Sequence, residues 1–305
     1  ALGSRLVPML IARGHEVTAM SRRPDNQATM RAAGAETVIA DGLERDAVVA
    51  AVVAARPEVV VHQMTALAGD LDMRNFERTF ETTNRLRTEG TENLLEGARR
   101  AGARRFVAQS FGGWPYARVG GPVKTEEDPL DEDPPAKVRT TLEAIKRLES
   151  LVLGEPSVEG LVLRYGGFYG PGTSLAPGGM QTQMVRKRRF PIVGDGGGVW
   201  SLIHVDDAAT VTAQAVERGA PGIYNVGDDD PAPVNEWLPY LADVLGAKPP
   251  RRVPAWIGRL VAGEHAVVMM TSLRGISNEK AKRELDWEPS RPSWRIGFRE
   301  LAGTS

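Results

Sequence analysis

Residues 16–62 read EVTAMSRRPDNQATMRAAGAETVIADGLERDAVVAAVVAARPEVVVH. The stretch holds three short apolar runs, at 16–20, 36–40 and 58–62, and the segments between them have the spacing of amphipathic helices. Strands that alternate with helices in this way pair in parallel through right-handed crossovers. The stretch therefore predicts an α/β fold built on a doubly wound parallel sheet, a Rossmann-like fold.

The same alternation continues on both sides of this stretch and ends near Gly166, where glycine and proline become frequent. The expected helices are 2–10, 26–33, 44–55, about 73–101 and 138–153, and the further strands are 105–109 and 161–164. Short helices and turns are expected from Asn278 to Leu301. We therefore predict a dinucleotide-binding domain of residues 1–165 plus about 201–227, and a smaller substrate-binding region of about 166–200 and 228–305.

Composition excludes several classes of protein. The 38 basic and 39 acidic residues give a net charge of -1, which provides no electrostatic attraction to nucleic acid or to an anionic membrane. The absence of cysteine excludes disulfides, zinc ribbons, iron–sulfur clusters and a cysteine nucleophile. Four histidines, at 15, 62, 204 and 265, lack metal-ligand spacing, so no metal site is expected. With no membrane-length apolar run and no signal segment, the sequence predicts a cytoplasmic protein.

The chain opens directly on a helical pattern, although this kind of fold begins with a strand. A dinucleotide pyrophosphate binds where the first strand leads through a glycine-rich turn into a helix. We expect Leu2 and Gly3 to lie at that turn, although a glycine at a helix start also occurs for local geometric reasons alone. Because the first strand lies inside such a sheet, we expect roughly 10 residues of strand and turn to be missing before Ala1.

Two positions after predicted strands bear on the cofactor. Arg22 and Arg23 follow the strand at 16–20, where arginine pairs with the 2′-phosphate of NADP and a carboxylate would select NAD. The alternative is a solvated basic turn, so NADP is expected and NAD stays possible. Asp41 follows the strand at 36–40 and either lies beside an adenine amino group or caps the helix at 44–55.

A series of motifs identifies a family. In order, they are Asp41-Gly42-Leu43, Val60-Val61-His62, Asn84 with Gly90-Thr91, and the runs 106–110, 164–172, 203–207, 223–227 and 285–289. With this order and spacing, the chain resembles an extended short-chain dehydrogenase/reductase of the NAD-dependent epimerase/dehydratase family. The cofactor contacts that the resemblance implies are Asp41, Gly42, Leu43, Lys146, Tyr165, Gly166 and Phe168, and the substrate contacts are Trp114, Tyr169 and Trp200.

The resemblance also implies hydride transfer at nicotinamide, with Ser110 orienting the substrate and Lys146 holding the ribose. The family's proton donor is a tyrosine four residues before that lysine, but this chain has Leu142 there. Two hypotheses follow. Either another tyrosine supplies the proton to a small carbonyl or hydroxyl substrate, or the protein is a non-catalytic NADP-binding regulator or redox sensor. The candidate tyrosines are Tyr116 first, then Tyr165 and Tyr169, each of which could equally be a packed loop aromatic.

A second departure concerns the substrate. Family members that act on nucleoside-diphosphate sugars carry an arginine shortly before the run at 203–207, and this chain has Trp200 there. An indole cannot pair with a diphosphate, which favours a smaller or more apolar substrate; alternatively, Trp200 only packs a hairpin. The resemblance further implies a possible homodimer through the helices at 73–101 and 138–153.

Overall fold

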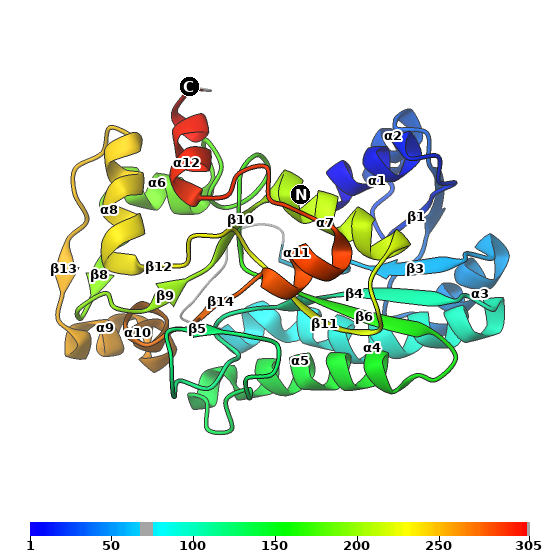
Figure 1. The fold of residues 1–305 in the computed structure, drawn as a ribbon, viewed down its shortest axis with the longest axis horizontal. Helices are drawn as coiled ribbons and strands as arrows, with labels where there is room; N and C mark the ends of the chain where they lie inside the picture. The colour runs from blue at the N-terminus through cyan, green and yellow to red at the C-terminus, as the bar shows by residue number, and fades with distance from the viewer. Residues whose placement is uncertain (68–75, 304–305) are drawn as a thin grey trace.

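Parallel strands form a four-stranded sheet and a separate two-stranded sheet, and the two-stranded sheet lies toward one edge of the molecule (Figure 1). The computed structural model describes residues 1–67 and 76–303. One sheet has the order β11 (Gly222–Val226), β6 (Glu159–Tyr165), β4 (Arg105–Phe111) and β3 (Val59–His62), and the other pairs β1 (Thr18–Ser21) with β2 (Glu36–Ile39). Every pair in both sheets is parallel, which confirms the predicted α/β architecture. Within the described residues, no strand joins β1 to β3.

Helices cover both faces of the larger sheet. One face carries α1 (Gly3–Ala12), α7 (Val205–Glu217) and α11 (Glu279–Leu285), and the other carries α3 (Arg45–Ala55), α4 (Phe76–Ala101) and α5 (Ala136–Gly154) (Figure 1). Helix α2 (Asp25–Ala32) connects β1 to β2. This arrangement is the double winding that the alternating sequence pattern predicted.

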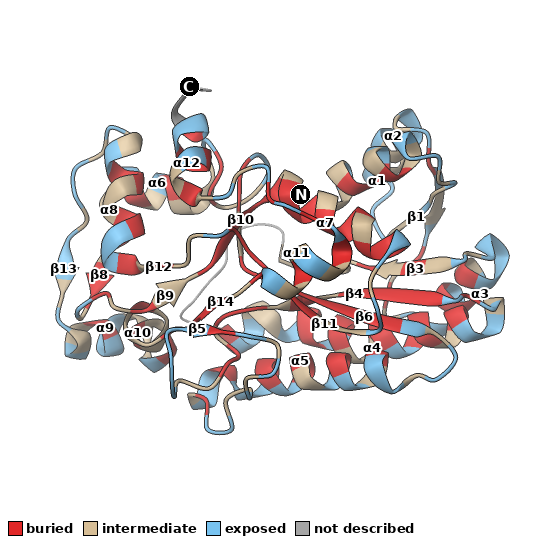
Figure 2. Ribbon diagram, viewed as in Figure 1, coloured by how far each residue is buried: buried red, intermediate tan, exposed pale blue. Residues whose placement is uncertain are grey.

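The strands are buried on both faces because helices pack on each (Figure 2). Successive side chains of β4 point to opposite sides: Val107 packs with the α1 and α7 cluster, whereas Phe106 and Ala108 pack with α3, α4 and α5. Gly160, on β6, is required by this packing, since a Cβ there would lie 2.2 Å from the Val152 carbonyl oxygen of α5.

The C-terminal part of the chain has a core of its own. Trp237, Trp294 and Phe298 are fully buried in it, with Tyr169 and Leu202. Its helices are α6 (Met180–Arg186), α8 (Val234–Val244), α9 (Ala255–Ala262), α10 (Glu264–Thr271) and α12 (Trp294–Gly303). The short strands are β5 (Val123–Lys124), β7 (Gly167–Tyr169), β8 (Ile192–Val193), β9 (Val199–Trp200), β10 (Leu202–His204), β12 (Ala232–Pro233), β13 (Arg252–Val253) and β14 (Gly275–Ile276).

Most predicted elements lie within two residues of the observed ones. The difference that matters is at β4, which continues through Ser110 to Phe111 instead of ending at Gln109. Met73, where the long helix was expected to begin, lies outside the described residues. Among the helices of the described residues, none combines the length and apolarity needed to cross a membrane.

Candidate active site

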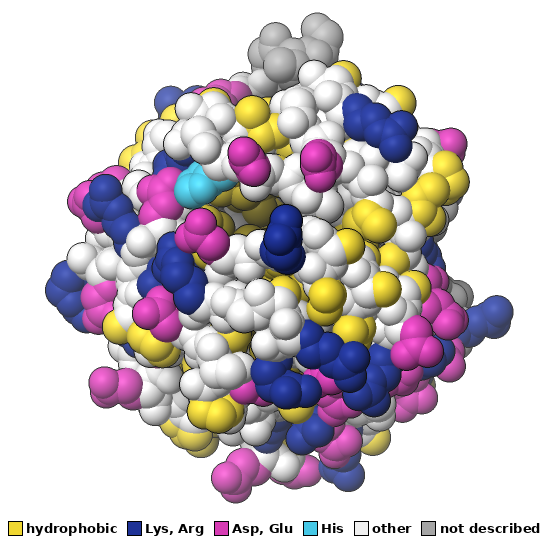
Figure 3. All heavy atoms as spheres, turned by 90° about the vertical axis from the view of Figure 1, so that its right-hand side faces the viewer, with side chains coloured by type: hydrophobic (Ala, Val, Ile, Leu, Met, Phe, Trp, Pro, Cys, Tyr) yellow, Lys and Arg dark blue, Asp and Glu magenta, His cyan; other side chains and the backbone are white. Residues whose placement is uncertain are grey.

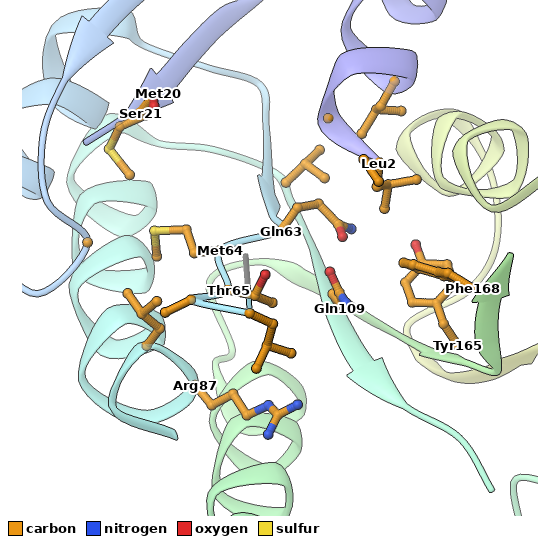
Figure 4. A pocket seen from close by; sticks show the side chains of 18 of the residues that line it. Leu2, Met20, Ser21, Gln63, Met64, Thr65, Arg87, Gln109, Tyr165 and Phe168 are labelled. Carbon is orange, nitrogen blue, oxygen red and sulfur yellow. The ribbon is translucent and has the colours of Figure 1, made fainter. Parts of the chain in front are cut away.

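A cavity of about 2070 Å³ opens at the carboxyl ends of the parallel strands. Ser21 and Tyr165 end strands, Gln63 follows one, and Gln109 lies two residues before the end of β4; all four line the cavity (Figure 4). Asp41, two residues after β2, also lines it. In doubly wound folds this edge of the sheet is the ligand site. The cavity also extends between β1 and β3, and the surface in Figure 3 is hollowed, with hydrophobic side chains at the floor of the hollow.

The start of α1 forms one end of the cavity. Leu2 and Gly3 both line it, and no side chain caps the helix. The first N–H groups of a helix have no acceptor within the helix and carry the positive end of its dipole. A Cβ on Gly3 would meet nothing within 4 Å, so space is open beside these groups. This end of the cavity suits a phosphate group.

The turns after β1 and β2 form another part of the wall. Arg22 and Arg23 line the cavity, are exposed, and make no ion pair within the described residues. Asp41 also lines the cavity, and its Oδ1 accepts a hydrogen bond of 3.0 Å from the Leu43 backbone N–H. Leu43 is therefore held by the turn but does not itself line the cavity. The carboxylate thus fixes a turn and still borders the cavity.

Gly42 allows this turn to approach α4 closely. A Cβ at Gly42 would lie 2.5 Å from Met64 Sδ and 2.9 Å from Leu86 Cδ2. Gly166, after β6, is equally restricted, because a Cβ there would lie 2.6 Å from the Ser201 carbonyl oxygen. Both glycines line the cavity, so larger side chains would displace its wall.

Ser110 and Tyr116 belong to a buried polar network that does not line the cavity. Ser110 Oγ donates to Glu149 Oε1 at 2.7 Å, and Arg164 forms a buried ion pair with both carboxylate oxygens of Glu149. Arg164 also donates to Tyr116 Oη at 2.8 Å, and Tyr116 donates to Asn225 Oδ1 at 2.7 Å. The Ser110 hydroxyl donates to Glu149 and the Tyr116 hydroxyl to Asn225, so neither is a free proton donor here; burial also raises the pKa of Tyr116.

The helix that carries the family's acid–base pair offers no proton donor at the cavity. Leu142 on α5 is 1% exposed, and Lys146, one turn later, donates from Nζ to the Asp131 carbonyl oxygen at 3.0 Å. Neither side chain lines the cavity, although Asp131 does. The structure therefore brings Lys146 only to the rim of the site, through the Asp131 loop.

The remaining predicted tyrosines differ in position. Tyr165 lines the cavity, shares a 2.6 Å hydrogen bond with Thr212 Oγ1 and packs edge-on against Phe168, which also lines the cavity. Tyr169 does not line it; its ring packs against His204 and Phe298 in the C-terminal core. Burial raises the pKa of both hydroxyl groups.

Two tryptophans predicted as substrate contacts do line the cavity. Trp200 donates from Nε1 to the Met269 carbonyl oxygen at 2.9 Å and packs against Trp237, so it is also a packing residue. Trp114 packs against Phe76 and Phe111, both of which line the cavity. With Phe80 and His265, these side chains form an aromatic wall that the sequence did not reveal.

The sequence also did not reveal Arg87, which lies on α4 and lines the cavity (Figure 4). It sits on the buried face of that helix, with Thr83, Asn84 and Thr91. Its sequence neighbours Arg85, Thr88 and Glu89 are polar, so no local sequence signal distinguishes Arg87 from a solvent-exposed position. No cluster of metal-ligating side chains occurs in residues 1–67 and 76–303.

These residues fit a nicotinamide dinucleotide. The uncapped start of α1, with open space at Gly3, suits a pyrophosphate, and the exposed Arg22 and Arg23 suit a ribose phosphate. Gln109, Tyr165 and Phe168 line the cavity beyond them, where a nicotinamide ring would lie against apolar and amide groups.

Comparison with known proteins agrees with this architecture. The profile described as "NAD dependent epimerase/dehydratase family" matches residues 1–227. A Streptomyces sp. protein named 3-diazoavenalumate denitrifying reductase is 45% identical over 97% of this chain and 95% of its own length. The 2-alkyl-3-oxoalkanoate reductase of Stenotrophomonas maltophilia (strain K279a) is 28% identical, over 81% of this chain and 73% of that protein.

Solved structures share the fold. The UDP-glucose 4-epimerase of Thermotoga maritima, solved with UDP-glucose, has a TM-score of 0.77 at 22% identity and covers 99% of this chain and 94% of its own. The UDP-glucose 4-epimerase of Thermus thermophilus, solved with NAD, has a TM-score of 0.73 at 25% identity, over 99% and 95% of the two chains. The chain therefore belongs to the NAD-dependent epimerase/dehydratase family, and with it to the NAD(P)-dependent oxidoreductases.

Proposed function

We propose that this protein is an NADP-dependent reductase that acts on an aromatic substrate from which a leaving group, such as a diazo group, departs on reduction. The observation that carries the proposal is Leu142: the helix that supplies the family's proton has only an apolar side chain at that position. The name of the Streptomyces relative supports it, since that protein is described as a denitrifying reductase of a diazo compound.

The proposed reaction balances without a proton from the protein. Reduced nicotinamide, when bound, supplies a hydride. Replacing a diazonium group by hydride forms a C–H bond, breaks the C–N bond and releases N2 with the bonding electron pair. Reduction of a carbonyl group, by contrast, leaves an oxyanion that must be protonated. A site whose described residues offer no free acid therefore suits the first reaction and disfavours the second.

The chain's own residues would bind, orient and exclude water. The aromatic wall of Phe76, Phe80 and Trp114 offers flat apolar surface for an aromatic ring. Lys146 is held by the Asp131 carbonyl and fixes the rim of the site, whereas Ser110 is held by Glu149 in the buried network outside the cavity. The protein's role is positioning, which supplies a large part of many catalytic rate enhancements.

The test compares two aromatic acids that differ in the reducible group: 4-carboxybenzenediazonium and 4-acetylbenzoate. With NADPH, we expect NADPH oxidation and N2 release with the first and no reduction of the second. Leu142→Tyr should add slow reduction of 4-acetylbenzoate, because it restores an acid one turn from Lys146. Its melting temperature must be checked, since overpacking at a buried site costs about 1–3 kcal/mol.

Reduction of 4-acetylbenzoate by the unmodified protein would contradict the proposal, because a proton donor would then exist elsewhere in the site. If NADPH bound and neither compound reacted, the non-catalytic, NADP-binding regulatory hypothesis would be favoured instead.

Cofactor choice gives a separate prediction. Replacing Arg22 and Arg23 together by serine should weaken NADPH binding about 10- to 100-fold, because charge-assisted contacts to a 2′-phosphate are lost. NADH binding should change less than about threefold. Isothermal titration calorimetry measures both affinities, and Arg31→Ser on α2, an exposed arginine that contacts Gln27, is the matched control. If NADH binding weakened as much as NADPH binding, the proposed contact with the 2′-phosphate would be ruled out.

The homodimer through α4 and α5 and the cytoplasmic location remain proposals. Light scattering coupled to size-exclusion chromatography tests the dimer directly.

A further inference from the structure

Arg87 is a buried cation that faces the cavity with almost no partner. It is 8% exposed, and within the described residues its side chain donates one hydrogen bond, of 3.3 Å, to Asn84 Oδ1. A guanidinium has five N–H donors, so most of its hydrogen-bonding capacity is unused. Burial lowers the pKa of Arg87 to about 10, which still leaves the group charged at neutral pH.

Glu149, the carboxylate that acts electrostatically on Arg87, already forms an ion pair with Arg164. Glu149 stabilises the charged form of Arg87 electrostatically, but its carboxylate pairs with Arg164, with the shortest contact at 2.5 Å. All three side chains are buried, and within the described residues Arg87 forms no ion pair of its own, so its positive charge lacks a counter-charge there. A buried charge without a counter-charge is strongly unfavourable, so an anionic ligand group is the natural complement.

Two phenylalanines of the aromatic wall, Phe76 and Phe80, lie on the same helix as Arg87. Phe80 and Phe76 precede Arg87 by seven and eleven residues, which is about 10 and 16 Å along an α-helix. Both phenylalanines line the cavity and stack on each other with ring centroids 4.3 Å apart. The site thus offers an aromatic surface and, some distance away, a fork of donors that matches a carboxylate.

We propose that Arg87 binds the carboxylate of an aromatic acid whose ring lies against Phe76, Phe80 and Trp114, with a short extended spacer between ring and carboxylate. This inference rests on the proposed function and adds the substrate's acidic group to it. Arg87 is separated in Figure 4 from Leu2, at the start of α1, so the anion it receives is distinct from the pyrophosphate that α1 would hold.

Calorimetric titration of the full chain with trans-cinnamate, a non-reactive probe, tests the site without turnover. Arg87→Met should weaken cinnamate binding about 10- to 100-fold and leave NADPH binding unchanged. Arg87→Lys should weaken cinnamate binding less than Arg87→Met does. Arg85→Met is the matched control, since Arg85 lies on the same helix in an exposed ion pair with Glu89. Unmodified protein should bind cinnamate more tightly than cinnamamide, and also more tightly than benzoate, which lacks the spacer.

Thermal unfolding separates a binding residue from a structural one. Removing a poorly paired buried charge should raise the melting temperature of Arg87→Met by about 2 °C or more. Equal cinnamate binding by Arg87→Met and unmodified protein would overturn the proposal, as would loss of NADPH binding, or loss of cinnamate binding with a lowered melting temperature. Arg87-dependent cinnamate binding without any diazonium turnover would support this site and reject the proposed reaction.

Discussion

Arg164→Met is expected to lower the free energy of unfolding by about 3–5 kcal/mol. The substitution leaves the Glu149 carboxylate buried without its counter-charge and removes the donor to Tyr116 Oη. Arg164 and Glu149 are 3% and 5% exposed, so solvent cannot replace the lost partner. Urea unfolding followed by circular dichroism measures the change.

A matched control uses a solvent-facing ion pair that joins α5 to α4. Arg147→Met breaks the 2.7 Å contact with Glu92, where both side chains are about half exposed, and should cost less than about 1 kcal/mol. Replacing Arg164 by methionine and Glu149 by leucine together should recover part of the loss, because the Glu149 carboxylate is then no longer buried without its partner. Equal effects of Arg164→Met and Arg147→Met would show that the buried pair is not the source of stability.

Acidification from pH 7 to pH 4 is expected to cost the protein about 3 kcal/mol through His62 alone. Burial lowers the pKa of His62 to about 4, against 6.5 in an unfolded chain. Its ring is held neutral, with Nδ1 accepting from the Met64 backbone N–H at 3.2 Å and Nε2 3.2 Å from the Leu86 carbonyl oxygen. Protonation would remove the acceptor that Met64 uses.

The sign follows from proton uptake. Between pH 6.5 and 4 the unfolded chain binds a proton at His62 and the native protein does not, so stability rises with pH. The contribution is complete above pH 6.5 and is lost as the pH falls to 4. The His62→Gln variant should be less stable at pH 7. Between pH 7 and pH 4 its free energy of unfolding, measured with urea, should fall by about 3 kcal/mol less than that of the unmodified protein. An unchanged dependence would mean that His62 takes up its proton without unfolding.

The sheet and its helices could be predicted because each element carries its own periodic pattern. The run at 105–109 is largely apolar on both faces, as a strand covered on both sides is expected to be. Several cavity-lining residues at or just after strand ends, such as Asp41 and Tyr165, could be predicted from the order of the strands and helices in the sequence. The cofactor-facing side of the site was therefore largely accessible from the sequence.

The interior of the site could not be predicted from the sequence, because it depends on how the helices are rotated against the sheet. Arg87 sits among Arg85, Thr88 and Glu89, which reads as a solvated face, and only the packing of α4 turns it toward the cavity. Ser110 was expected at a strand end facing substrate, but β4 continues past it in register with β6 and its hydroxyl turns to Glu149. Neither outcome is encoded in local spacing.

The cavity takes its walls from two separately packed cores. Gln109 and Tyr165 belong to the sheet, whereas Trp200, Val268 and Met269 come from the C-terminal region. Substitutions on the second wall leave the packing of the parallel strands untouched. If the sheet side of the cavity holds the cofactor, as proposed, new substrates can be acquired through changes on the C-terminal wall alone, which is how one fold comes to serve many reactions.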